Sequence, residues 1–176
     1  MSEDKAESSN AISHLEETSV PAWVYPYRAG VIGGALGGLT MIAVAAIYGL
    51  SSGRGLWLPV NLIGATLVRD LQTASLEELS QFNFSALAAG LFLHLMLAIG
   101  LGFVFALLLP TLPGPVFVWA IVIGSGLWIL ASLLTLPLLN PVMGVYVDRP
   151  SFYVAHVAYC IVLGLWVMRS PKIHVR

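Results

Sequence analysis

Two long stretches without a charged side chain constrain the fold of this chain more than any other feature. No Asp, Glu, Lys or Arg lies between Arg28 and Arg54, and none lies between Glu78 and Asp148. A helix needs about 20 predominantly apolar residues to cross a bilayer, and the chain offers four runs of that kind. The sequence therefore predicts an all-α integral membrane protein with four transmembrane helices, at about 29–50, 86–109, 116–137 and 151–169.

Composition excludes several classes of function. Of the 176 residues, 58% are hydrophobic and 10% are charged, whereas a soluble domain has about 25% charged residues. Almost the whole chain is expected to lie in the lipid bilayer, which leaves no room for a soluble catalytic domain. We therefore expect that the protein has no catalytic activity of its own. The net charge of −1 gives no basic surface for nucleic acid.

The chain divides into three parts by composition. Residues 1–27 form a polar N-terminal arm and an interfacial anchor rich in Trp and Tyr, residues 28–170 form the transmembrane domain, and residues 171–176 form a basic tail. Four spans place both termini on one side. The basic residues favour the cytoplasm for that side, with Lys5, Arg28, Arg169, Lys172 and Arg176 there and Arg54, Arg69 and Arg149 opposite.

The connections between the spans carry their own predictions. The short link Thr111–Pro115 predicts that the second and third spans are antiparallel neighbours. The apolar segment 57–64 is too short to span and suits a re-entrant or interfacial position. Ser75 and Glu78 have the spacing of a capping box at the start of a short helix. We interpret Asp148 and Arg149 as a solvated loop pair.

A histidine lies inside each of two spans. His94 and His156 are each followed four residues later by a small residue and eight residues later by glycine, at Gly102 and Gly164. An ionisable group at membrane depth is costly and seldom faces lipid, so both histidines are candidate functional residues. Residues four apart share a helix face, and a face of small residues packs on another helix. We therefore expect both imidazoles to point into the protein.

The two histidine segments suggest an internal duplication. Ile99, Leu101 and Gly102 match Ile161, Leu163 and Gly164 when the histidines are aligned. The preceding span is followed by a proline and an asparagine in both halves, Asn61 in the first and Asn140 in the second. A duplicated two-helix unit would place the two histidine helices parallel and the histidines at a similar depth.

Several roles for the histidines stay open at this point. Two inward imidazoles with small residues behind them suit ligation of haem b, and an imidazole near a quinone or on a proton path is also possible. The simplest interpretation is a histidine hydrogen-bonded to a neighbouring helix. No carboxylate lies inside a span to complete a zinc or two-metal site, so we predict none.

Glycines and asparagines complete the set of candidate residues. Gly30, Gly34 and Gly38 recur every four residues in the first span and predict close helix packing, inside the bundle or with a partner subunit. Asn61 and Asn140 suit the repair of backbone near a proline, or a polar path joining them to the histidines.

The pattern of four spans with His-x(7)-Gly in the second and fourth resembles small four-span bacterial membrane proteins of the accessory-subunit type. Some proteins of that kind are encoded with, or copurify with, respiratory oxidase and quinol-oxidising complexes. The resemblance implies a non-catalytic subunit of a larger complex in the bacterial inner membrane, most simply a respiratory or electron-transfer assembly, with other membrane subunits and the lipid bilayer as partners. A small transporter or channel, and a haem b-bearing electron-transfer subunit using His94 and His156, are the alternatives.

Overall fold

The computed structural model describes residues 23–174, and the protein is an all-α membrane protein. Four helical segments are long and apolar enough to cross a bilayer, namely α2 (Tyr27–Ser51), α5 (Phe84–Leu108), α6 with its continuation (Val116–Leu139) and α9 (Arg149–Arg169). They confirm the four predicted spans. The polar arm falls almost wholly outside the described residues.

Capping side chains and prolines set the ends of the long helices. The side chain of Asn83 accepts a hydrogen bond from the backbone N–H of Ala86 at 3.0 Å and starts α5. The side chain of Asp148 accepts from the backbone N–H of Ser151 at 2.9 Å and starts α9. The interpretation of Asp148 as a plain loop residue is therefore wrong, because its carboxylate satisfies a free N–H of the helix.

The third span is interrupted near its end. The helix α6 (Val116–Leu130) continues into a π-helical turn, Ala131–Thr135, and then into α7 (Leu136–Leu139). Pro137 lacks an N–H, and its ring clashes with the carbonyl one turn earlier, so a widened turn before it is the expected response. Asn140 ends α7, and its side chain caps α8 (Pro141–Tyr146) by accepting from the N–H of Met143 at 3.1 Å.

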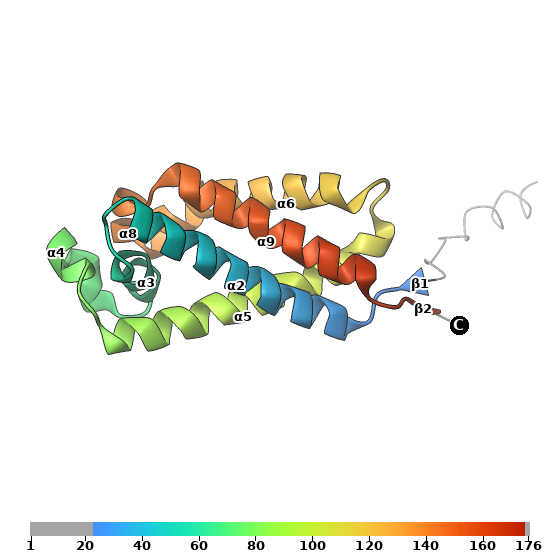
Figure 1. The fold of residues 1–176 in the computed structure, drawn as a ribbon, viewed down its shortest axis with the longest axis horizontal. Coiled ribbons are helices and arrows are strands. Elements are labelled where there is room, and N and C mark those ends of the chain that lie inside the picture. Colours follow the sequence, from blue (N-terminus) through green and yellow to red (C-terminus); the bar gives the residue numbers. More distant parts are fainter. Residues whose placement is uncertain (1–22, 175–176) are drawn as a thin grey trace, which may run out of the picture.

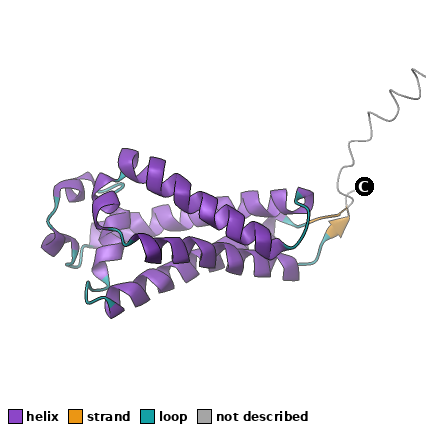
Figure 2. Ribbon diagram, turned by 90° about the horizontal axis from the view of Figure 1, so that it is seen from above, coloured by secondary structure: helices purple, strands orange, loops and turns teal. Residues whose placement is uncertain are grey.

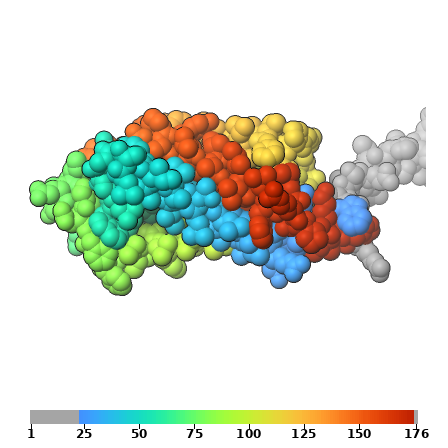
Figure 3. All heavy atoms as spheres, in the orientation of Figure 1, coloured from blue at the N-terminus to red at the C-terminus, as the bar shows by residue number. Residues whose placement is uncertain are grey.

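The four long helices pack in the order α5, α2, α9, α6, so that α2 and α9 are the inner pair (Figures 1 and 3). Glycines on two faces of α2 make this possible. Gly30, Gly34 and Gly38 lie against α5, whereas Gly33 and Gly37 lie against α9. The stripe Gly30, Gly34 and Gly38 is therefore packed inside the bundle, against α5, and does not face a partner subunit.

The helices α5 and α6 are antiparallel, as expected from the short link, but they do not pack along one another. Each uses its small residues on a different inner helix. Gly102 of α5 lies against Gly30 and Gly34, and Gly124 of α6 lies against the backbone of His156 and Val157. The two spans were predicted to be antiparallel neighbours. They are antiparallel, but the prediction that they pack directly on one another is wrong, and a gap remains between them.

Short helices form a cap at the end of the bundle away from the termini (Figures 1 and 2). The helix α3 (Trp57–Gly64) packs on the start of α5, where Gly64 lies against the backbone of Ala86. A 3-10 turn, Arg69–Thr73, and α4 (Leu76–Leu79) follow it. The capping box of α4 is confirmed, with the backbone N–H of Ser75 donating to Glu78 at 2.8 Å. The cap has its own apolar core, made by Leu58, Leu62, Ala65, Leu71, Leu79, Ala86 and Val142.

The opposite end of the bundle holds both ends of the described chain. The two-residue strand β1 (Trp23–Val24) pairs antiparallel with β2 (Ile173–His174). The pairing follows from an even number of spans, which returns the chain to the side on which it started.

The two halves of the chain repeat one order of elements. Each half has a long helix, then a short cap helix with a buried asparagine in it or at its start, then a long helix that contains a histidine. These are α2, α3 and α5 in the first half and α6, α8 and α9 in the second. The contacts of α2 show that α5 and α9 both run antiparallel to it, so the two histidine helices are parallel to one another. This arrangement is the one that a duplicated two-helix unit predicts.

Candidate functional site

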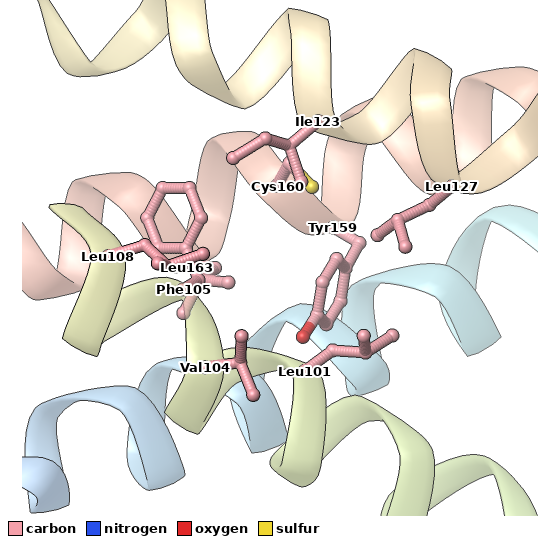
Figure 4. A pocket seen from close by; sticks show the side chains of 9 residues that line it. All are labelled: Leu101, Val104, Phe105, Leu108, Ile123, Leu127, Tyr159, Cys160 and Leu163. Atoms are coloured by element: carbon pink, nitrogen blue, oxygen red, sulfur yellow. The ribbon is translucent and has the colours of Figure 1, made fainter. Parts of the chain in front are cut away.

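The gap between α5 and α6 is an apolar crevice of about 200 Å³ (Figure 4). Tyr159, Cys160 and Leu163 of the inner helix α9 form its floor. Its two walls come from α5 and α6, through Leu101, Val104, Phe105, Leu108, Ile123 and Leu127. The one polar group of the floor that could reach into it, the Tyr159 hydroxyl, is already used. It donates to the carbonyl of Ala98 at 2.6 Å.

His94 joins α5 to α2. Its Nε2 lies 2.9 Å from the carbonyl oxygen of Gly38. A carbonyl only accepts, so Nε2 carries the proton of this hydrogen bond, and Nδ1 of the neutral ring is left as an acceptor. Gly38 lets α5 come this close, because a Cβ there would lie 2.9 Å from the Cβ of Ala98.

His156 bonds within its own helix. Its Nδ1 lies 2.7 Å from the carbonyl oxygen of Phe152, one turn earlier, and its ring meets the Phe152 ring edge to face at 4.4 Å. By the same argument Nδ1 carries the proton and Nε2 is the free acceptor. Both histidines are half-buried.

The side-chain amides of the two cap asparagines donate hydrogen bonds within the cap. Asn140 is buried and its Nδ2 donates to the carbonyl of Leu62 at 2.6 Å and to the hydroxyl of Thr66 at 2.8 Å. Asn61 is also buried, and its Nδ2 donates to the carbonyls of Leu79 and Gln81 at 2.8 and 2.6 Å. The structure brings the two asparagines together in the cap, where they satisfy backbone around the short helices.

Three buried polar atoms have no hydrogen-bond partner among the described residues. They are Oδ1 of Asn61, Nε1 of Trp128 and Oγ of Ser132. Trp128 and Ser132 lie four residues apart on α6 and its π-helical turn, and π-helical turns are frequent at functional sites. No sequence pattern singled them out, because their significance depends on the turn before Pro137.

The geometry bears on the alternatives for the histidines. Within residues 23–174, no group of three or more His, Cys, Asp or Glu side chains could hold a metal ion. A haem between the imidazoles would need room for a flat macrocycle, and the crevice is lined by neither histidine. We route no chemistry through a haem.

Gly164 follows the crevice-floor residue Leu163 on α9. A Cβ on it would lie 2.9 Å from Cγ1 of Val116 in α6. The stripe that begins at His94 therefore faces α2, and the stripe that begins at His156 faces α6 at its glycine. Comparison with models of protein families, with curated proteins and with solved structures found no match to this chain.

Proposed function

We propose that this protein is a non-catalytic membrane subunit that binds a transmembrane helix of a partner protein across the face formed by α5 and α6. One observation carries the proposal. Of the glycines in the four spanning helices, only Gly100 and Gly126 have open space where a side chain would be. The others lie against a neighbouring helix or, for Gly49, against the loop residue Gly55. Small residues on a spanning helix are typical of helix–helix interfaces, where they let two backbones approach closely.

The positions of the two open glycines support one common partner. Gly100 precedes Leu101 on α5, and Gly126 precedes Leu127 on α6. Leu101 and Leu127 lie at the same end of the crevice (Figure 4). The glycines therefore flank the crevice at a similar level, one on each side of its opening. A single helix lying over the crevice would meet both.

The rest of this face suits a protein neighbour in a bilayer. Val104 and Leu108 on one side and Leu130 on the other are about half exposed and wholly apolar. Transporters and pumps commonly keep charged side chains along their transport path. No charged side chain lies in α5 or α6. We place the protein in the bacterial inner membrane with both termini cytoplasmic. The excess of Lys and Arg on the terminal side supports this placement, and a respiratory or electron-transfer complex is the assembly we propose.

The test is to replace both glycines with leucine, so that side chains occupy the open space beside the crevice. Gly100→Leu with Gly126→Leu should leave the chain folded, because nothing lies within 4 Å of either added Cβ and glycine is a poor helix former. Protein extracted from its native membrane in mild detergent would be sized by native mass spectrometry. We expect the wild type to carry a membrane protein in fixed stoichiometry, and the double variant to lose it with at least a tenfold weaker association.

Ala43→Leu provides the matched control. Ala43 is an exposed small residue of α2, away from the crevice, so this variant should keep the partner. The proposal is wrong if the double variant stays fully assembled, or if the wild type extracts alone or only with copies of itself.

A further inference from the structure

The crevice ends near two unused hydrogen-bond acceptors. Nδ1 of His94 and Nε2 of His156 have no partner among residues 23–174, since the opposite nitrogen of each ring makes the recorded hydrogen bond. An imidazole nitrogen without a proton accepts a hydrogen bond and cannot donate one. A molecule that satisfied both would therefore present donors.

Helix geometry places the two imidazoles beyond the same end of the crevice. His156 lies four residues before Cys160, on the same face of α9 and about 6 Å along the axis. His94 lies seven residues before Leu101, again on the same face and about 10 Å along α5. Because α5 and α9 run parallel, both steps lead in the same direction, towards the cap. Both rings are half-buried. Neither lines the crevice itself, so a head group would meet them beyond its end.

The chemistry of the two parts differs sharply. The crevice lining consists of aliphatic and aromatic side chains and one thiol, and the Tyr159 hydroxyl is held by Ala98. With both rings neutral, the imidazole end offers two acceptors, and no Lys or Arg lies in α5 or α6. A phosphate or carboxylate head would find no cation there, and a free ion would find no cluster of ligands within the described residues. A long apolar chain fits the first part, and a head with hydroxyl donors fits the second.

We propose that the crevice and the two histidines form one binding site for a bilayer-dissolved amphiphile that has an apolar chain and a head with two hydroxyl groups. The chain lies along Cys160 and Leu163, and the hydroxyls donate to Nδ1 of His94 and Nε2 of His156. A hydroquinone with an alkyl tail and a monoacylglycerol both have this chemistry. The inference goes beyond the proposed function, because the site lies within one chain and needs no partner helix.

Binding is measured on the isolated chain in detergent by native mass spectrometry with titration. The probes are decylhydroquinone and monodecanoylglycerol, with the dimethyl ether of decylhydroquinone as the probe that lacks donors. We expect one molecule bound per chain, and a dimethyl ether at least about fivefold weaker than its parent, because each hydrogen bond contributes about 1 kcal/mol. The tighter of the two diols identifies the source of the head group.

Substitutions separate the site from general detergent-like binding. His156→Phe keeps the ring volume and should weaken the better diol about five- to tenfold while leaving the dimethyl ether unchanged. Val104→Phe narrows the crevice and should weaken all the probes. Leu133→Phe, on the lipid face of the π-helical turn and 73% exposed, should change none of them.

Three results would overturn the inference. They are equal affinity for decylhydroquinone and its dimethyl ether, affinity for the diols that survives His156→Phe, and probe binding that Val104→Phe does not reduce. His94→Phe also removes the bond to Gly38, so His156→Phe is the decisive variant. Because the isolated chain is used, failure here says nothing against the partner helix, and loss of the partner says nothing against this site.

Discussion

The contact between α2 and α5 at Gly34 leads to a prediction whose size can be worked out from the structure. A Cβ on Gly34 would lie 2.5 Å from the carbonyl oxygen of Ala98 and 3.0 Å from Cα of Ile99. Both are backbone atoms, so no side chain can rotate away, and α5 must move outward. Overpacking of this kind costs about 1–3 kcal/mol, and alanine returns about 1 kcal/mol through its better helix propensity. If overpacking costs about 2–3 kcal/mol, the upper part of its range, the net loss of stability in Gly34→Ala is about 1–2 kcal/mol.

The single cysteine provides the assay. Cys160 is the only cysteine of the chain and is fully buried, so a thiol-reactive fluorogenic dye reports unfolding in detergent. We expect the melting temperature of Gly34→Ala to fall by about 2–8 °C. Gly100→Ala, the same change at an open position of α5, should leave the melting temperature equal to that of the wild type or raise it. The close packing of α2 on α5 is refuted if both variants melt alike.

Three further substitutions test other contacts by the same melting assay. Asn140→Ala leaves the buried carbonyl of Leu62 without its donor and should cost about 3 kcal/mol, summed over the hydrogen bonds lost; a loss under 1 kcal/mol would contradict the role of Asn140 in the cap. Tyr159→Phe removes the bond to Ala98 and should cost about 1 kcal/mol, whereas no change would mean that this bond does not join α9 to α5. The hydrogen bond from the backbone of Ser151 lowers the pKa of Asp148 from its usual 3.8, so the carboxylate stabilises the fold above about pH 4 and loses that effect as the pH falls through its lowered pKa. The advantage of the wild type over Asp148→Asn should therefore shrink on acidification, and a gap that stays constant from pH 7 to pH 3 would contradict the assignment.

The positions of the spans could be predicted from the distribution of charged residues and prolines along the sequence. Charged residues are absent from the spans and collect at their ends, and prolines such as Pro110 and Pro115 mark where a helix cannot continue. The order in which the helices pack could not be predicted. The lipid-facing and protein-facing sides of α5 and α6 are both apolar, so a pattern of hydrophobic and polar residues does not distinguish them.

The sequence identified candidate residues more readily than it identified the groups with which they form hydrogen bonds. His94 and His156 stand out because an ionisable group is rare in a span, yet their hydrogen bonds go to backbone carbonyls, which the sequence does not identify. The crevice combines residues of three helices and depends on the packing order, so it had no signature of its own. Asp148 had a usable signal, since an aspartate two residues before a proline is typical of a helix start, with the aspartate as cap and the proline in the first turn.

The two glycine faces of α2 have a consequence for how the chain is assembled in its membrane. The face at Gly34 meets α5, the next span to be inserted, but the face at Gly37 meets Tyr159 of α9, the last span. During synthesis that second face stays bare until more than half of the chain has been made. A chain that stops before α9 therefore leaves Gly33 and Gly37 without the helix that covers them in the complete fold.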